Sequence, residues 1–340
     1  MFMQITPVDI HDDAELDAVY ALRKTASDHD TPERAGPCAI AFPRSLRHPR
    51  AGSELVSFVA RVDGHIVGDV QLFLPTKDNT HFAGVQVVVH PEHRRRGIGR
   101  ALLDHGLDVA RELGRTTVSG GVDATRDGGG PVRSEAGRLF AEGAGFTPAL
   151  TLVNRTLDFT TVDADDEERL MVEALAKSGD YETIAWSDAT PPELQGPLGV
   201  LQSTFISEAP MGDLDLEEEK VDVDHVRETD AHNALLGYRT FGVAARLVGS
   251  TEIAAFTRIG VPTNPGDHAE QWMTIAAAGH RGHRLGLRVK LENHRLLRAS
   301  MPNVRYVHTD NADVNGPMIR VNDALGFRPT DLCIEYQRAL

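Results

Sequence analysis

The chain has 340 residues, 41% of them hydrophobic and 25% charged, which is typical of a soluble globular protein large enough for two ordinary domains. Its net charge of −15 argues against nucleic-acid binding, which normally requires a basic face, but it allows a cationic substrate. No apolar run approaches the roughly 20 residues that cross a bilayer, so we expect no membrane partner. We also expect no secretory signal, and the two cysteines, Cys38 and Cys333, fit a reducing compartment. The expected location is therefore the cytoplasm.

The first half of the chain begins with a helical pattern around 13–27 and a strand pair at 57–75, in which Val-Asp-Gly is a good hairpin signal. An apolar strand at 82–89 leads into a loop rich in Gly and Arg. The leucines after this loop recur at helical spacing, which predicts a helix. The half is completed by a strand at 116–122, a Gly-rich loop at 123–131, a helix that ends at Gly-Phe and a strand at 150–159.

The second half repeats this order of elements. His93 and His280, Arg94 and Arg281, and Gly99 and Gly286 share an offset of 187 positions. The stretch 160–169 is interpreted as the crossing between two similar domains, 1–160 and 161–340. The acidic run at 213–220 is interpreted as a solvated loop or helix end. The other expected elements are helices around 166–178, 192–206 and 223–235, a strand pair at 237–261 with a Val-Gly-Ser turn, and strands at 269–277, 304–310 and 332–340.

A strand, a Gly-rich loop and a helix together form a geometry that binds phosphate. The first turn of a helix has free N–H groups and a partial positive charge, glycines let the backbone approach the anion, and arginines add forked donors. A Walker loop is excluded because its Lys-Ser/Thr is missing, and a dinucleotide fingerprint is excluded because Gly97-Ile98-Gly99 is followed by Arg-Ala-Leu. The pattern that remains is Arg/Gln-x-x-Gly-x-Gly/Ala, which residues 94–99 fulfil.

With this pattern the chain resembles the GNAT N-acetyltransferases, in which the loop holds the pyrophosphate of acetyl-CoA. The lead-in VVVHPEH and the later segment TDNADVNGPMIRVNDALGF are similar to the family's strand-four ending and its strand-five and helix-four segment. The second loop, 280–286, is a variant with Arg284 in place of the first glycine. The resemblance covers most of the chain. It implies the α+β class and two tandem GNAT folds, each a mixed, mostly antiparallel sheet flanked by helices, in a layout similar to that of mycothiol synthases.

The resemblance also implies an acetyl-CoA site in each copy. In the family two parallel strands splay, and the pantetheine chain inserts between them. Backbone groups near Val87 and Val89, or near Thr274 and Ala276, would then take the place of a neighbouring strand. The residues implied to hold the pyrophosphate are Arg94, Arg95, Arg96, Gly97, Ile98, Gly99 and Arg100 in the first copy and Arg281, Gly282, His283, Arg284, Leu285, Gly286 and Leu287 in the second. Asn311 and Asn315 are expected to bond the CoA arm.

The chemistry of the family is direct attack by a neutral amine, which needs a base for the ammonium proton and often an acid for the CoA thiolate. The base candidates are His268 and Glu270, near the start of the fourth strand of the second copy, although either position also suits a solvated residue at a strand edge. The family's acid is a tyrosine four residues before the glycine of helix-four Gly-Phe. The second copy has Asn322 there and the first has Ala141, so water or another side chain would have to protonate the thiolate.

The two copies differ in what they keep of the family's pattern. The first has the intact loop, but it lacks the asparagines, and its base candidates His81 and Glu92 are weaker. The second keeps the asparagines. We therefore predict that the C-terminal copy is catalytic and that the N-terminal copy still binds CoA.

The predicted function is acetyl transfer from acetyl-CoA to an amine of a small molecule, by a protein that can be oligomeric. The alternative is a non-catalytic acyl-CoA-binding or regulatory protein, because neither copy has the tyrosine. The pairs His90-x-x-His93 and His280-x-x-His283 have a metal-like spacing, but each pair belongs to a phosphate loop, so no metal site is predicted.

Overall fold

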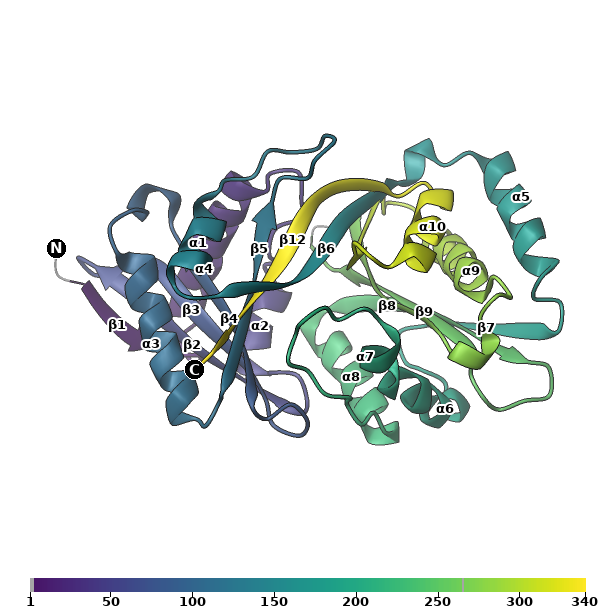
Figure 1. The fold of residues 1–340 in the computed structure, drawn as a ribbon, viewed down its shortest axis with the longest axis horizontal. Helices are drawn as coiled ribbons and strands as arrows, with labels where there is room; N and C mark the ends of the chain where they lie inside the picture. The colour runs from purple at the N-terminus through teal and green to yellow at the C-terminus, as the bar shows by residue number, and fades with distance from the viewer. Residues whose placement is uncertain (1–2, 265) are drawn as a thin grey trace. The chain divides into compact units, whose positions relative to one another are not determined.

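The computed structural model describes residues 3–264 and 266–340, and the contacts within it divide the chain into two compact units (Figure 1). The N-terminal unit comprises Met1–Thr151, Gly212–Glu217 and Leu332–Leu340, and the C-terminal unit comprises Leu152–Met211 and Glu218–Asp331. Each unit holds a mixed, mostly antiparallel sheet with helices on its faces. The predicted α+β class and the two similar halves are therefore confirmed.

The sheet of the N-terminal unit has the order β1-β2-β3-β4-β5-β12, in which β4 and β5 run parallel and the other neighbours are antiparallel. Val59 packs with Leu16 and Val19 of α1, whereas the next residue, Ala60, packs with Leu102 of α3. Because successive residues of a strand point to opposite faces, α1 and α3 cover opposite faces of this sheet. The elements are β1 (Met3–Pro7), α1 (Asp13–Asp30), α2 (Ala41–Arg47), β2 (Ser53–Val62), β3 (His65–Pro75), β4 (Phe82–Val89), η1 (Pro91–His93), α3 (Ile98–Glu112), β5 (Thr117–Ala124) and α4 (Ala136–Gly143).

The sheet of the C-terminal unit has the order β7-β8-β9-β10-β11-β6, and here β10 and β11 are the parallel pair. Phe256 packs with Leu194 and Leu198 of α6, and Ile259 packs with Leu287 of α9, so these helices cover opposite faces. The remaining elements of the chain, including β12 of the N-terminal sheet, are β6 (Thr147–Asp158), η2 (Phe159–Thr161), α5 (Ala164–Leu175), β7 (Tyr181–Ser187), α6 (Pro192–Ser203), α7 (Phe205–Glu208), α8 (Val223–Leu236), β8 (Tyr238–Leu247), β9 (Ala255–Pro262), β10 (His268–Ala276), η3 (Ala278–His280), α9 (Leu285–Ser300), β11 (Tyr306–Ala312), α10 (Gly316–Ala324) and β12 (Arg328–Ala339).

The last strand of each sequence copy pairs within the unit of the other copy. Leu152–Asp158 of β6 pair with Tyr306–Ala312 of β11, and Leu332–Ala339 of β12 pair with Thr117–Ala124 of β5. The compact units therefore do not follow a single cut near residue 160. The repeated sequence order alone carries no sign of this exchange, because either copy of the strand satisfies the same pattern.

Both expected hairpin turns are present, but the second belongs to a longer connection. In the first half, Asp63 and Gly64 have φ of 49° and 83°, and they form the tight turn between β2 and β3 that the sequence predicts. In the second half, the predicted Val-Gly-Ser turn is also present, with Gly249 at φ 82° and a hydrogen bond from the Ser250 N–H to the Leu247 carbonyl (2.9 Å). The strand β9 begins only at Ala255, so further residues without regular structure follow this turn.

Residues 213–220 form no helix or strand and their acidic residues are exposed, which agrees with a solvated loop, but the first part of this loop is bound within the N-terminal unit. The hydroxyl of Thr117 donates to the carboxylate of Asp215 (2.7 Å), and the Asp215 N–H donates to the side chain of Gln337 (2.7 Å). The amide of Asn79 bonds both backbone groups of Glu217. The chain thus leaves the C-terminal unit after Met211, adds a segment to the N-terminal unit and returns.

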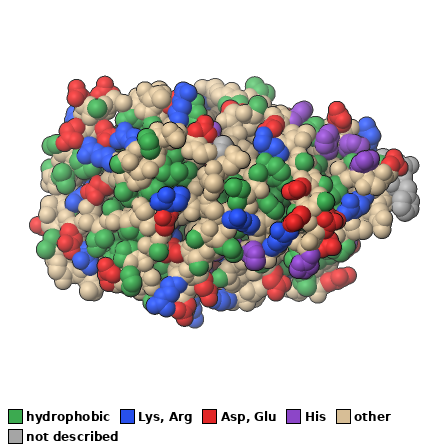
Figure 2. Space-filling view, turned by 180° about the vertical axis from the view of Figure 1, so that it is seen from behind, with side chains coloured by type: hydrophobic (Ala, Val, Ile, Leu, Met, Phe, Trp, Pro, Cys, Tyr) green, Lys and Arg blue, Asp and Glu red, His purple; other side chains and the backbone are tan. Residues whose placement is uncertain are grey.

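No helix within the described residues is long and apolar enough to cross a membrane. On the face shown in Figure 2, Lys and Arg side chains are interspersed with Asp and Glu side chains. Arginine and carboxylate groups pair repeatedly in the described structure, as in the pair of Arg295 with Glu167 (2.7 Å).

Candidate functional site

The parallel strands separate at the corresponding place in both units. In the N-terminal unit, Phe82–Gly84 of β4 pair with Thr117–Ser119 of β5, and the strands then part. In the C-terminal unit, His268–Glu270 of β10 pair with Tyr306–His308 of β11, and these strands part as well. Beyond those points lie Val87 and Val89 of β4 and Thr274 and Ala276 of β10. Backbone groups along such an edge can bind an extended ligand as a neighbouring strand would.

A β-bulge in β10 distinguishes the C-terminal unit. The register of β10 against β9 shifts between Gln271 and Met273, so Trp272 is the extra residue. In β4 the register against β3 has no shift between the pair of Gly84 with Phe73 and the pair of Val89 with Gly68. A bulge bends its strand and re-aims side chains, and here it follows directly after the last residue of β10 that pairs with β11.

The Gly/Arg loop of the N-terminal unit ends at the first turn of α3. Its backbone takes the left-handed conformation at Arg95 (φ 62°) and at Gly97 (φ 83°). The first helical hydrogen bond runs from the Ala101 N–H to the Gly97 carbonyl, which leaves the preceding N–H groups at the helix end available for an anion. A Cβ atom added at Gly97 would meet no heavy atom within 4 Å, so there is open space above this turn.

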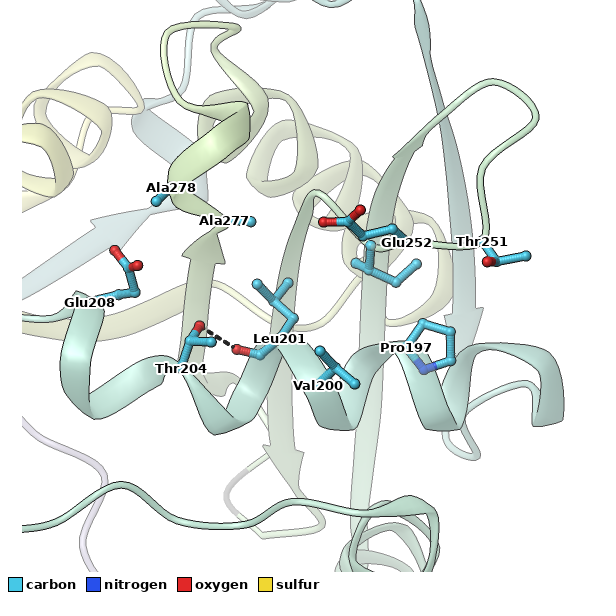
Figure 3. Close-up of a pocket in the computed structure, with 10 residues that line it drawn as sticks. Pro197, Val200, Leu201, Thr204, Glu208, Thr251, Glu252, Ala277 and Ala278 are labelled. Carbon is cyan, nitrogen blue, oxygen red and sulfur yellow. Dashed lines mark hydrogen bonds between the residues drawn. The ribbon is translucent and has the colours of Figure 1, made fainter.

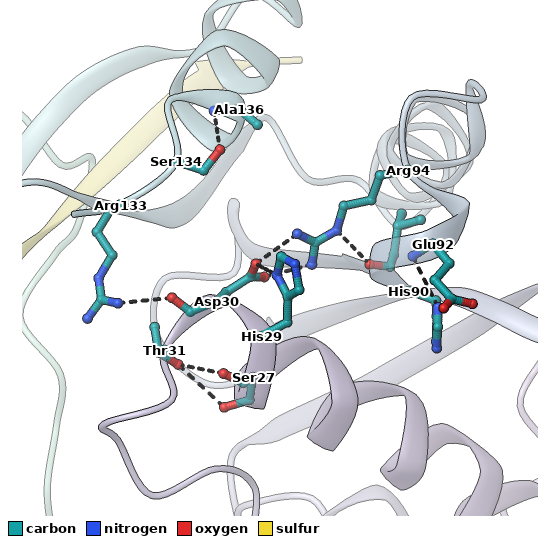
Figure 4. Close-up of polar contacts among 11 residues, drawn as sticks. Ser27, His29, Asp30, Thr31, His90, Glu92, Arg94, Arg133, Ser134 and Ala136 are labelled. Atoms are coloured by element: carbon teal, nitrogen blue, oxygen red, sulfur yellow. Dashed lines mark hydrogen bonds and ion pairs between the residues drawn. The ribbon is translucent and has the colours of Figure 1, made fainter. Parts of the chain in front are cut away.

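Arg94 is held in place at the start of this loop (Figure 4). Its guanidinium makes two hydrogen bonds to the carboxylate of Asp30 (2.8 and 2.7 Å), and its Nε donates to the Val89 carbonyl (3.0 Å). Burial opposes the ionisation of Asp30, but the hydrogen bonds and charges of Arg94 and His29 outweigh it and lower the Asp30 pKa. Arg94 is thus a fixed cation beside the loop.

Two other arginines of this loop bond backbone carbonyls. Arg96 donates to the backbone carbonyl of Glu92 (2.9 Å), and Arg100 donates to that of Gly143 (2.7 Å). Ile98 is buried against the sheet and anchors the first turn of α3. At Gly99, an added Cβ would lie in ordinary contact with Val89, at 3.5 Å.

The loop of the C-terminal unit has the same backbone shape. Gly282 (φ 86°) and Arg284 (φ 54°) take the left-handed conformation at the positions of Arg95 and Gly97. Arg284 therefore adopts the conformation of the glycine that it replaces, which is unfavourable for a residue with a Cβ. The first helical hydrogen bond runs from Arg288 to the Arg284 carbonyl, and Cβ atoms added at Gly282 or Gly286 would meet nothing within 4 Å.

The side chains of this second loop are paired with neighbours in its own unit. Arg281 forms an ion pair with Glu208, and Arg284 forms one with Glu173 (2.7 Å). His283 lies 3.2 Å from the Lys177 carbonyl. Leu285 and Leu287 are buried and anchor the start of α9. Open space above left-handed turns, free N–H groups and nearby arginines make both loops fit a pyrophosphate.

A cavity of about 410 Å³ adjoins the start of the second loop (Figure 3). Its wall is largely apolar, with Val200 and Leu201 of α6 on one side and Ile253 on the other, and it reaches Ala277 and Ala278 just after β10. The carboxylates of Glu208 and Glu252 also border it. The C-terminal unit therefore has a hollow beside its phosphate loop, on the face that carries α6.

The two predicted base candidates lie together where β10 and β11 separate. His268 Nδ1 is 2.6 Å from His308 Nε2, the two rings are stacked 4.9 Å apart, and His308 Nδ1 is 2.9 Å from the hydroxyl of Thr156. Burial lowers the pKa of His268, and the charge of Asp267 opposes this only in part. Glu270 is exposed and pairs directly with His308 across the two strands.

The N-terminal unit lacks such groups at the corresponding pairs. Phe82 and Gly84 occupy the places of His268 and Glu270, and Ser119 occupies that of His308. The weaker candidates of this unit lie apart from the point of separation. The His81 ring bonds the Asp215 carbonyl (3.1 Å), and Glu92 is exposed in η1.

Asn322 is fully buried, and its amide is occupied. Its Oδ1 accepts from Lys290 Nζ (2.6 Å) and its Nδ2 donates to Asn311 (3.1 Å). The Nδ2 of Asn311 in turn donates to the Ala312 carbonyl, and Asn315 caps α10 by accepting from the Met318 N–H. These asparagines stabilise the fold around α10. An amide is also no acid near neutral pH, so Asn322 cannot supply a proton as the family's tyrosine does.

Several residues of this region were absent from the sequence-based candidates. His308 could have been found by pairing the strand at 304–310 with the start of β10. Lys290 occupies the helix position of Leu103 in the first copy, and burial, with help from the charge of Arg155, lowers its pKa to about 7. Trp272 lies within the strand predicted at 269–277, and a bulge has no clear signal in a single sequence.

The histidine pairs with metal-like spacing do not form a ligand cluster. Among the described residues, no group of three or more His, Cys, Asp or Glu side chains is placed to hold a metal ion. The rings of His90 and His93 meet edge to face, and His280 bonds the Tyr181 hydroxyl (3.0 Å).

Comparisons with known proteins agree on one family. The model of the acetyltransferase (GNAT) family matches residues 17–127. A solved tandem GNAT protein from the clavulanic acid biosynthesis pathway shares 29% identity, with 99% of this chain and 98% of that chain covered and a TM-score of 0.83. The comparison with curated proteins gave no match.

More distant structures share the fold alone. A GCN5-related N-acetyltransferase from Sphaerobacter thermophilus is 14% identical, with 99% of this chain and 95% of that chain covered and a TM-score of 0.65. The Saccharomyces cerevisiae N-myristoyltransferase with bound myristoyl-CoA is 11% identical, with 98% and 78% covered and a TM-score of 0.59.

Proposed function

The chain belongs to the GNAT family of acetyltransferases as a tandem, two-domain member, and from this premise we propose that it transfers an acetyl group from acetyl-CoA to an amine of a small molecule. Use of an acyl-CoA donor follows from the family. The acetyl group, the small acceptor and the choice of the C-terminal unit as the catalytic one are the finer parts of the proposal.

One observation carries the choice of the C-terminal unit. Where the parallel strands separate, this unit has His268, Glu270 and His308, whereas the N-terminal unit has Phe82, Gly84 and Ser119. Acetyl transfer to an amine needs a group that takes the proton of the ammonium ion. Only the first set can do so near neutral pH.

We assign the base to His268. Its lowered pKa keeps the ring neutral near pH 7, so it can accept a proton from the ammonium. The hydrogen-bonded chain of Thr156, His308 and His268 orients the ring and shares the positive charge that it gains. The carboxylate of Glu270 attracts the ammonium ion to this place. Because Asn322 is buried and is no acid, we assign protonation of the departing thiolate to water.

Acetyl-CoA supplies the acetyl thioester, whose C–S bond is exchanged for a C–N bond to the amine. The unpaired edge of β10 near Thr274 and Ala276 would hold its pantetheine arm. The N–H groups from Gly282 to Leu287 and the side chain of Arg281 would hold its pyrophosphate, after Glu208 has given up its ion pair. The N-terminal loop fits the same pyrophosphate, so we propose that this unit binds CoA without catalysing the transfer.

Matched glutamate substitutions in the two loops test which unit catalyses acetyl transfer. A side chain at Gly286 enters open space, and one at Gly99 meets only ordinary contacts, so both variants should fold. We expect Gly286→Glu to abolish thiol release over a panel of amines, because its carboxylate repels the pyrophosphate at the start of α9. Gly99→Glu should retain turnover. The reverse result would refute the C-terminal assignment.

Isothermal titration with acetyl-CoA counts the sites. The wild type should bind two equivalents, and each variant one. If acetyl-CoA binds but no amine in a broad panel releases thiol, the alternative of a non-catalytic acyl-CoA-binding protein is favoured.

A further inference from the structure

Trp272 occupies an unusual place for an indole. It is the extra residue of the β10 bulge, it follows the last residues of β10 that pair with β11, and 40% of its surface is exposed. The only other tryptophan of the sequence, Trp186, is buried in the core under α6. Large aromatic side chains left exposed beside a reactive site often serve to bind a ligand.

The indole of Trp272 packs on the sheet in a fixed position. A Cβ atom at Gly260 would lie only 2.0 Å from Cζ2 of its ring, so one side of the indole lies directly on the backbone of β9. The ring of Tyr238 from β8 meets it edge to face, with centroids 5.5 Å apart and planes at 61°. The glycine and the tyrosine fix the orientation of the ring, and the exposed part of the indole lies away from Gly260.

The indole lies on the same face of the sheet as the proposed reacting groups. Glu270 is the direct partner of Gly260 in the register of β9 and β10, and it is also the partner of His308. His268 lies two residues earlier on the strand and therefore points to the same face as Glu270. A ligand on the indole thus has a carboxylate and an imidazole at one end.

We propose that Trp272 is a specificity-determining residue and that the acceptor is a primary amine carried on a flat, apolar ring, which stacks on the indole while its ammonium group lies toward Glu270 and His268. This inference rests on the proposed function, because it places the acceptor in the C-terminal site. The pairing of a carboxylate with an aromatic face suits a cation with an apolar body, and the chain's net charge of −15 favours its approach.

Tryptophan fluorescence tests this binding without any turnover. The probes are 2-phenylethylamine, which has a ring, and butylamine, which has none. In the absence of acetyl-CoA, 2-phenylethylamine should shield the exposed indole from quenching by acrylamide, and butylamine should not. In Trp272→Leu the remaining signal comes from buried Trp186, so the shielding should vanish. Equal shielding by both amines, or none by either, would overturn the proposal.

Kinetics supply the second readout. Trp272→Leu should raise the KM for 2-phenylethylamine about three- to tenfold, as expected from the loss of one stacking contact, with little change in kcat and none in the KM for butylamine. Trp272→Phe should recover part of the loss, and it also serves if the leucine variant folds poorly. The matched control is Phe73→Leu, since Phe73 is 41% exposed on β3 of the N-terminal unit. An equal rise in KM for both amines would refute the stacking role. Shielding without thiol release would refute the proposed function and leave the binding site standing.

Discussion

Lys290 offers a quantitative test of the packing around α10. Its side chain is 1% exposed, its Nζ donates to Asn322 and lies 4.7 Å from the centroid of the Phe327 ring, and burial lowers its pKa to about 7. The perturbation is Lys290→Met, which keeps the length of the chain and removes the titrating group. It also brings the position close to Leu103, its counterpart in the first copy.

The sign of the effect follows from linkage. In the unfolded chain Lys290 stays protonated up to its ordinary pKa of 10.5, whereas in the folded chain it loses its proton near pH 7. The unfolded state therefore binds more protons between these values, and the stability of the wild type rises with pH there. Burying the charged form costs about 4 kcal/mol at pH 7 and below about 1 kcal/mol at pH 10. Losing the hydrogen bond to Asn322 costs the variant about 1 to 2 kcal/mol at either pH.

Lys290→Met should therefore be about 2 kcal/mol more stable than the wild type at pH 7 and about 1 kcal/mol less stable at pH 10. Urea unfolding followed by tryptophan fluorescence measures this, because Trp186 and Trp272 both belong to the C-terminal unit. Lys177→Met, at an exposed lysine of the same unit, should show no change of sign. A difference from the wild type that stays the same at pH 7 and pH 10 would refute the reasoning.

Three further changes are expected to have measurable effects. Gly260→Ala should displace the ring of Trp272 and lower stability by about 1 to 3 kcal/mol, with a shift of the fluorescence emission that a distant alanine substitution would not cause. Arg284→Gly should raise the stability of the C-terminal unit by about 0.5 to 1 kcal/mol, because it relieves a left-handed residue and loses only a surface ion pair; an unchanged or lower urea midpoint would contradict this. Since burial lowers the pKa of His268, kcat/KM for an amine should lose the contribution of this base only below pH 6.5, and His268→Gln should remove that limb of the pH profile.

The repeated elements of the fold could be predicted because their patterns are local. Apolar strands, the Gly/Arg loop and leucines at helical spacing occur twice, and they place α3 and α9 after corresponding loops. The exchange of β6 and β12 could not be predicted, since strand pairing over such distances leaves no local pattern. The contacts of the segment around Asp215 could not be predicted for a similar reason. An acidic run is usually solvated, and nothing in its own residues indicates the side chains of Thr117 and Gln337 that bind it.

The residues of the candidate site also fall into those that the sequence indicated and those that it missed. His268 and Glu270 were found because the family's motif gives the place of the strand on which they lie. His308 and Trp272 were missed, since one belongs to the neighbouring strand and the other depends on a bulge. Asn322 was singled out only because it stands at the position of the family's tyrosine. In the structure its side chain is buried and accepts a hydrogen bond from Lys290, which the pattern of residues along the helix does not reveal.

The exchange of the last strands bears on how the two copies could diverge. After a gene is doubled, one copy is usually free to decay or be deleted once the other does the work. Here deletion of either copy would strip the survivor of a strand, leaving the open edge of β5 or β11 as a template for aggregation. A copy that has lost its catalytic activity is therefore retained, because the other copy needs its last strand. Its loop and strands then remain available to selection for a second role.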